Sequence, residues 1–181
     1  MLDPESGDGD TFSHITNVCV YSVMLARSLG IQDQKELVGI GQAALLHDVG
    51  KCSVSGDILR KPGRLTKPER ELINDHPRQG FVRLCHRSDL NEGQLRMVYE
   101  HHEKIDGSGY PVGLTGPEIH WMARLCSVVD VFDALTGRRC YRKPTSYADA
   151  GDYLKQNAGS QFSPEFVECW IQNLPSTVPT S

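Results

Sequence analysis

The feature that most constrains this chain is an apolar segment that runs directly into two adjacent metal-ligating side chains. Residues 43–46 read Ala-Ala-Leu-Leu, and His47 and Asp48 follow at once. A histidine and an aspartate at the buried end of an apolar helix cost free energy unless a partner compensates them. Other histidines and aspartates of the chain could provide that partner by enclosing a cation with this pair. Gly50 is expected to end the helix, because glycine tolerates positive φ.

Composition sets the outer limits of the interpretation. The chain has 181 residues, of which 39% are hydrophobic, enough for one domain with a substantial core. Its 19 basic and 23 acidic residues give a formal charge of -4, so no long nucleic acid is expected as a partner. The six cysteines include no C-x-x-C pair, which favours reduced thiols in a cytoplasmic protein. No apolar run reaches the length of a signal or membrane segment, so no membrane association is expected.

Helical spacing of apolar residues recurs along the chain, and no alternating pattern of useful length predicts a strand. The sequence therefore predicts an all-α fold, a single-domain helical bundle with a metal centre in its core. The expected domain covers residues 10–174, between a flexible segment at 1–9 and a disordered tail at 175–181. The expected helices cover 11–29, 34–47, 66–87, 92–102, 118–136, 146–158 and 164–173.

Several polar residues interrupt apolar faces of these helices. Asp130 lies in the middle of the most apolar helix, where an unpaired carboxylate would destabilise the fold, so a metal, arginine or histidine partner is expected. Pro77 should break or kink its helix and could aim His76 inward. His101 and His102 could converge on a metal pair at a helix end. A single histidine on an apolar face, such as His14, is more often an ordinary core residue.

Two segments suggest ligand contacts. Residues 106–111 read Asp-Gly-Ser-Gly-Tyr-Pro, in which the glycines permit turns and Pro111 should hold Tyr110 extended beside the double histidine. Residues 138–143 read Arg-Arg-Cys-Tyr-Arg-Lys, which fits a phosphate-binding rim, although a solvated surface is the usual fate of such a run. Asp133 is expected to face the helix end or this basic segment.

Taken together, these motifs resemble the HD superfamily of metal-dependent phosphohydrolases, and within it the HD-GYP subfamily of bacterial cyclic di-GMP phosphodiesterases. In chain order they are His14, His47-Asp48 with Gly50-Lys51, His76-Pro77-x-x-Gly80, His101-His102-Glu103-x-x-Asp106-Gly107-x-Gly109-Tyr110-Pro111 and Asp130-Val131-Phe132-Asp133-Ala134-Leu135-Thr136. The resemblance covers roughly residues 10 to 173. Its specificity comes from the order of the motifs, above all from the tripeptide Gly-Tyr-Pro directly after the double histidine.

The resemblance implies a set of metal ligands in which the aspartate of the HD pair bridges two ions. The residues matched to ligands are His14, His47, Asp48, His76, His101, His102 and Asp130. Some members bind a third ion through a glutamate four residues before the first histidine. Asp10 holds that position here and is one methylene shorter. Two ions, or three, are therefore expected.

The resemblance also implies substrate contacts. Lys51 would contact the scissile phosphate, and Arg139 and Arg142 would bind substrate phosphates, with Cys140 in place of the proline found in the family. Asn17 replaces an arginine that many members carry. Tyr110 could stack on a guanine or hydrogen-bond near the phosphate.

The residue types agree with two-metal hydrolysis. Imidazole and carboxylate donors suit iron or manganese better than magnesium. Two such ions about 3.5 to 4 Å apart can hold a bridging water, lower its pKa from roughly 16 toward 7 and clamp phosphoryl oxygens. Asp48 and Lys51 are then the expected catalytic residues, and no protein nucleophile is needed.

The predicted function is hydrolysis of cyclic di-GMP to linear pGpG, with GMP as a further product. Two alternatives remain: an HD-type hydrolase of another nucleotide, and a non-catalytic cyclic di-GMP receptor or protein-interaction module. Little sequence precedes His14, so a separate regulatory or sensor domain or protein is an expected partner. A homodimer is also compatible with the sequence.

Overall fold

The computed structural model describes residues 8–137 and 144–174, which form helices and connecting turns with no β-strand. The helical elements are α1 (Asp8–Ser28), α2 (Gln34–Leu46), η1 (Val49–Ser53), α3 (Gly56–Leu59), α4 (Lys67–Asn74), α5 (His76–Leu84), α6 (Glu92–Glu100), η2 (Gly116–Glu118), α7 (Trp121–Thr136), α8 (Tyr147–Gln156) and α9 (Pro164–Gln172). The predicted all-α fold is confirmed. No helix in these ranges is long and apolar enough to span a bilayer.

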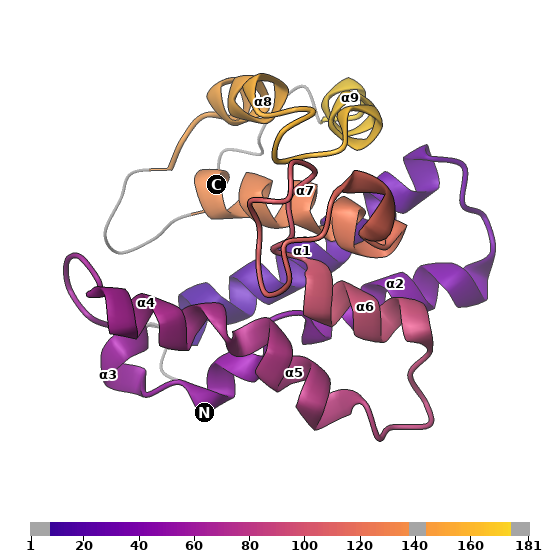
Figure 1. Ribbon diagram of the computed structural model, residues 1–181. Helices are drawn as coiled ribbons and strands as arrows, with labels where there is room; N and C mark the ends of the chain where they lie inside the picture. The colour runs from indigo at the N-terminus through magenta and orange to yellow at the C-terminus, as the bar shows by residue number, and fades with distance from the viewer. Residues whose placement is uncertain (1–7, 138–143, 175–181) are drawn as a thin grey trace.

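Helix α7 lies at the centre of the bundle, as its apolar sequence predicts. It packs against α1 and α6 on one side and against α8 and α9 on the other (Figure 1). Its residue Phe132 is fully buried and meets Trp170 of α9 edge to face, with ring centroids 5.3 Å apart. Because α7 contacts both layers, a polar residue on its buried face reaches the interior of the molecule.

Two of the expected helix boundaries change. The segment expected as one helix over 66–87 divides between Asn74 and His76, as the proline at position 77 predicts. The helix expected from residue 118 begins at Trp121, because residues 116–118 form a separate 3₁₀ turn. His120 then caps α7, and its ring Nδ1 accepts a hydrogen bond from the backbone N–H of Met122 at 3.3 Å.

The explanation predicted for Gly50 is wrong. Helix α2 ends at Leu46, and Gly50 lies within η1 with no positive φ. Glycine is required here for its small size, since a Cβ at position 50 would lie 1.9 Å from the carbonyl oxygen of His76. The bare backbone of η1 therefore packs directly on the start of α5 and brings Asp48 near His76.

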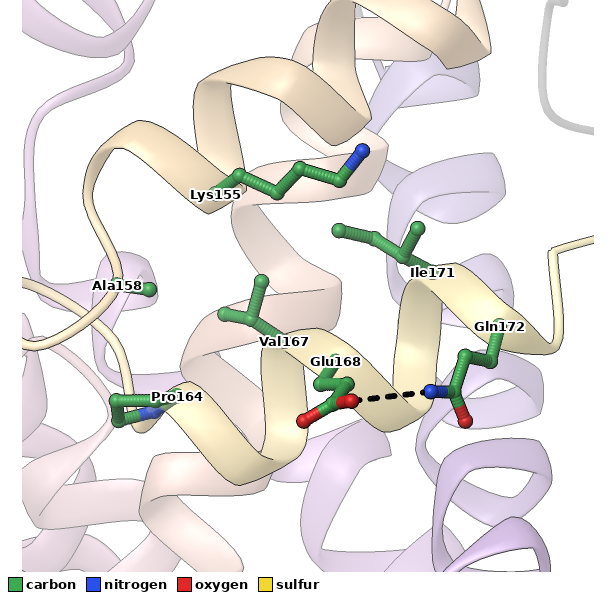
Figure 2. Close-up of a pocket in the computed structure, with 7 residues that line it drawn as sticks. All are labelled: Lys155, Ala158, Pro164, Val167, Glu168, Ile171 and Gln172. Atoms are coloured by element: carbon green, nitrogen blue, oxygen red, sulfur yellow. Dashed lines mark hydrogen bonds between the residues drawn. The ribbon is translucent and has the colours of Figure 1, made fainter.

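A groove lies between α8 and α9 (Figure 2). These two helices form the layer of the bundle beyond α7 (Figure 1). The groove measures about 350 Å³ and has Val167 and Ile171 among its lining residues, with Lys155 and Glu168 also on its walls. None of the predicted site residues lines it. The side chains predicted to carry chemistry gather instead on the other side of α7.

Candidate metal centre

The predicted ligands that the structure describes converge from separate elements. His14 comes from α1, Asp130 from α7, and the others stand at or beside helix ends. His47 directly follows α2, His76 begins α5 and His101 directly follows α6. The side chains of His47, His76 and His101 are almost completely buried. This clustering of titratable groups has the composition of a site for a divalent metal.

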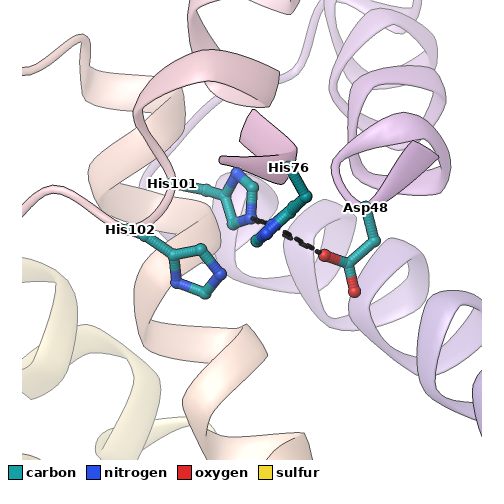
Figure 3. A group of neighbouring side chains, drawn as sticks. All are labelled: Asp48, His76, His101 and His102. Atoms are coloured by element: carbon teal, nitrogen blue, oxygen red, sulfur yellow. Dashed lines mark hydrogen bonds and ion pairs between the residues drawn. The ribbon is translucent and has the colours of Figure 1, made fainter. Parts of the chain in front are cut away.

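Asp48 lies between two groups of histidines, with one carboxylate oxygen toward each group. Figure 3 shows it with the group of His76, His101 and His102. Its Oδ1 lies 3.1 Å from Nε2 of His76 and 3.8 Å from Nε2 of His101. Its Oδ2 lies 3.4 Å from Nε2 of His47 and 3.9 Å from Nε2 of His14. Asp48 thus belongs to two groups of potential ligands, one with His76, His101 and His102 and one with His14 and His47. A carboxylate shared in this way is suited to bridging two cations.

Three of the histidines are oriented by carbonyl oxygens at the ends of helices. The ring Nδ1–H donates to the backbone carbonyl three residues earlier in His47 (2.6 Å), His76 (2.7 Å) and His101 (3.0 Å). Each acceptor belongs to the last turn of a helix, where carbonyls lack intrahelical donors. The hydrogen bond fixes the tautomer and turns the Nε2 lone pair toward Asp48.

Buried polar atoms in the cluster lack the partners that a cation would supply. Nε2 of His47 and Oδ1 of Asp48 are buried and have no hydrogen-bond partner. Nε2 of His76 lies 3.2 Å from Nε2 of His101, although both rings already commit their Nδ1–H to carbonyls. Burial holds the pKa of His101 well below its usual range, so its Nε2 carries a lone pair. These residues fit divalent metal ions.

His14 is held by a different arrangement, in which side chains replace the carbonyl. Its Nδ1 donates to Oδ2 of Asp133 at 2.7 Å, and its Nε2 lies 3.1 Å from Oδ1 of Asp130. Oδ1 of Asp133 accepts a second hydrogen bond, from the amide of Asn17 at 2.8 Å. Asp133 therefore reaches across to α1, a contact that the sequence did not predict. Its predicted contact with the basic segment stays a prediction, because residues 138–143 lie outside the described part of the chain. Its position three residues after Asp130 was the available signal, since such residues share a helix face.

The charges of the cluster shift the pKa values of its members in opposite directions. Burial alone would lower the pKa of His14, but hydrogen bonds to Asp130 and Asp133 raise it to about 9. Burial lowers the pKa of His102 to about 4, which keeps this ring neutral at pH 7. Burial opposes ionisation of Asp48, yet His47 and Lys51 hold the pKa of this carboxyl well below its usual range.

Lys51 extends from the cluster to its rim. Its ammonium nitrogen donates to Oδ2 of Asp48 at 2.5 Å, and 36% of the side chain is exposed. The two side chains meet because Lys51 follows Asp48 by one turn of the 3₁₀ helix η1, which begins directly after Asp48. An anionic group that approached the cluster from solvent could therefore meet this ammonium.

Tyr110 lies against the double histidine, as the sequence predicted. Its ring centroid is 4.8 Å from that of His102, and its backbone N–H donates to the carbonyl of His102 at 3.2 Å. The Tyr110–Pro111 peptide bond is cis. Burial raises the pKa of the Tyr110 hydroxyl, so the group stays protonated and can donate a hydrogen bond.

The remaining predicted site residues are not placed. Arg139 and Arg142 lie outside the described residues, and the side chain of Asp10 lies outside the described part of α1. The phosphate-binding rim and the third ion accordingly stay predictions.

Comparison with known proteins gives the family context. Residues 11–166 match the model of the HD domain. A cyclic di-GMP phosphodiesterase of Pseudomonas aeruginosa is 36% identical over 168 residues, which cover 93% of this chain and 40% of that protein. A 3′3′-cGAMP-specific phosphodiesterase of Vibrio cholerae is 37% identical, with 86% of this chain and 33% of that protein covered.

The fold also resembles a solved structure. A HDG"Y"P protein of Bdellovibrio bacteriovorus superposes with a TM-score of 0.72 at 23% identity, with 88% of this chain and 50% of that chain covered. The chain thus spans less than half the length of either curated relative, and their names describe proteins with further sequence beyond the matched part.

Proposed function

We propose, because this chain belongs to the HD-domain family, that it is a metal-dependent phosphodiesterase of cyclic dinucleotides, with cyclic di-GMP as its substrate. The observation that carries the proposal is the shared position of Asp48 between two groups of histidines. Two-metal sites of this kind occur in phosphatases and nucleases. The names of the relatives supply the substrate class.

The cluster would hold two cations, with iron or manganese best matched to a donor set dominated by imidazole. When bound, such a pair supplies an activated water and a clamp for phosphoryl oxygens. His14, His47 and Asp130 would bind on one side of Asp48, and His76, His101 and His102 on the other. Asp10 is the candidate ligand for a third ion.

The chain's own residues would bind and orient the substrate. The Lys51 ammonium, at the rim of the cluster, would pair with a non-bridging oxygen of the scissile phosphate and offset charge that develops there. The phenol ring of Tyr110 offers an aromatic face beside His102 on which a guanine could stack. Arg139 and Arg142 would bind the second phosphate. The expected products are linear pGpG and, after a second hydrolysis, GMP.

A second candidate substrate is 3′3′-cGAMP, because relatives of similar identity are specific for that dinucleotide. Both substrates contain the same phosphodiester linkages, so the metal centre would serve either one. The preference for one dinucleotide over the other would depend on contacts between the protein and the second base. A cytoplasmic location, a separate regulatory partner and a homodimer belong to the same proposal.

The test is hydrolysis of both dinucleotides by anaerobically purified protein loaded with iron or manganese. We expect conversion of cyclic di-GMP to pGpG, detected by chromatography, with metal analysis of the same sample. Binding of cyclic di-GMP by fully metallated protein without any product would favour the non-catalytic receptor. Hydrolysis of 3′3′-cGAMP alone would reassign the substrate.

Lys51→Ala tests the role given to the ammonium. We expect the variant to keep its metals and to lose roughly 100- to 1000-fold in kcat, the usual cost of removing one group that stabilises transition-state charge. Metal analysis and kinetics are measured on the same preparation. Loss of metal in Lys51→Ala would contradict the role.

A further inference from the structure

Glu103 is a buried carboxylate that the catalytic scheme does not use. It directly follows His102 in the chain, and only 3% of the residue is exposed. Among the described residues its oxygens contact no lysine or arginine, and backbone N–H groups are their hydrogen-bond donors. Burying a carboxylate in this way is costly unless its hydrogen bonds are satisfied. The arrangement of its donors therefore indicates a specific task.

Three consecutive backbone N–H groups point at this carboxylate. Oε1 accepts from Val112 at 2.7 Å and from Gly113 at 3.1 Å. Oε2 accepts from Gly113 at 3.0 Å and from Leu114 at 3.0 Å. Hydrogen bonds to a charged acceptor are about twice as strong as those between neutral groups. The side chain of Glu103 thus holds the turn of residues 112–114, which follows Tyr110, through hydrogen bonds to its backbone.

The same loop packs closely on the backbone of Glu103. A Cβ on Gly109 would lie 2.5 Å from Cα of Glu103 and 2.4 Å from the backbone nitrogen of Lys104, so only glycine fits. The loop is further joined to the connection between α8 and α9, where the N–H of Asp106 donates to the carbonyl of Ser160 at 2.9 Å (Figure 1). Tyr110 therefore lies between two fixed points, Gly109 before it and the Glu103-bound turn after it.

We propose that Glu103 is a positioning residue whose carboxylate holds the 112–114 turn and thereby fixes the Tyr110 ring against His102. The fixed ring forms an aromatic wall at the metal centre, placed to receive a nucleobase of the substrate. The identity of that ligand rests on the proposed function, whereas the hold on the loop does not. Glu103 acts on substrate only through Tyr110.

Amide hydrogen exchange tests the hold on the loop without any need for turnover. In Glu103→Ala, with metal loaded as in the wild type, we expect exchange of the amides of residues 112–114 to accelerate by about tenfold or more, as buried hydrogen bonds are lost. Glu103→Gln keeps one acceptor oxygen and places an amide NH₂ against the remaining donors, so its effect should be intermediate.

Glu118→Gln is the matched control. Glu118 also receives a backbone N–H, that of Thr115 at 2.8 Å, but it is exposed and caps η2 at the far end of the same loop. We expect its substitution to leave exchange at residues 112–114 and the exposure of Tyr110 unchanged. Equal acceleration in both variants would mean general loosening of the loop and would overturn the proposal.

The exposure of the Tyr110 ring is measured by its rate of nitration with tetranitromethane. Mass spectrometry identifies which tyrosine is modified. Faster modification of Tyr110 is expected in Glu103→Ala, and also in Gly109→Ala, which disturbs the same loop from its other side. Thermal melting and metal content identify any variant that has merely failed to fold. Tyr110 nitration that stays at the wild-type rate in a folded Glu103→Ala would overturn the proposal.

A double-mutant cycle then tests whether Glu103 acts through Tyr110. With cyclic di-GMP as substrate, Glu103→Gln should raise KM several-fold with a smaller effect on kcat, and it should add nothing in the Tyr110→Ala background. Additive effects would contradict a role through Tyr110. If the wild type hydrolyses neither dinucleotide, the proposed function fails, and the exchange and nitration results still decide the role of Glu103.

Discussion

On one side of Asp48, His76 and His101 are both held by carbonyl oxygens, at the ends of α4 and α6. On the other side, a carbonyl oxygen at the end of α2 holds His47, but the carboxylate of Asp133 holds His14. The first kind of support belongs to the backbone and exists wherever the helices end at those residues. The second depends on two further side chains, since Asn17 also binds Asp133. A side-chain support can be removed by one substitution without moving a helix, so the two halves of the centre should respond differently to mutation.

Asp48→Ala should abolish metal binding in both halves of the centre. Asp48 provides an oxygen to each group of histidines, so its loss leaves neither side with a shared ligand. We expect metal content to fall to background and hydrolysis of cyclic di-GMP to be abolished, while circular dichroism still reports a helical protein. Full metal content in this variant would contradict a shared centre.

Gly50→Ala should break the backbone-supported half. The new methyl group would overlap the carbonyl oxygen of His76, so η1 and α5 must separate. We expect a thermal transition several degrees lower and loss of the metal bound by His76 and His101, measured by calorimetry and metal analysis. Gly30→Ala is a control of the same chemistry at a site with open space around it. Alanine is strained at the positive φ of Gly30, so this variant should lose some stability, yet its metal content should match the wild type.

Asp133→Asn should weaken only the half that contains His14. The amide oxygen can still accept a hydrogen bond from His14, but the negative charge that increases the basicity of the imidazole is lost. Removing such a partner of a metal-bound histidine typically costs about 10- to 100-fold in metal affinity. We expect titration with Mn²⁺ to show one weakened site and one unchanged site. Equal weakening of both sites would remove the distinction between the halves.

The two halves should also differ in their response to pH. In the metal-free protein the pKa of His14 is about 9, because Asp130 and Asp133 stabilise its protonated form, so a metal must displace a proton there at pH 7. The pKa of His102 is about 4, so this ring is already neutral. Against burial, Asp48 also raises the pKa of His47 on the same side. Apparent affinity at the His14 side should therefore rise by about tenfold or more between pH 7 and 8, and level off once both rings are neutral. The His102 side should be nearly constant over that range.

The sequence predicted the bundle, most of its helices and the residues that gather in the cluster, because these depend on local periodicity and on motifs in a fixed order. It could not give the support of each histidine. The bond from His14 to Asp133 joins residues far apart in the chain, and it depends on how α1 crosses α7.

Errors arose where a local rule met a tertiary contact. Gly50 looked like a helix terminator with positive φ, but what requires glycine is the backbone of α5 lying against it. Glu103 entered the sequence analysis only as a member of the motif after the double histidine, since nothing local indicates that the turn of residues 112–114 folds back onto it. In both cases the chemistry was visible in the sequence and the contact was not.

The most direct test of the account is electron paramagnetic resonance of the anaerobic protein loaded with Mn²⁺. A centre in which Asp48 bridges two cations predicts a spin-coupled pair of ions at full loading, and loss of that signal in Asp48→Ala. A spectrum of isolated Mn²⁺ ions at full loading would contradict the shared centre on which the proposed function depends.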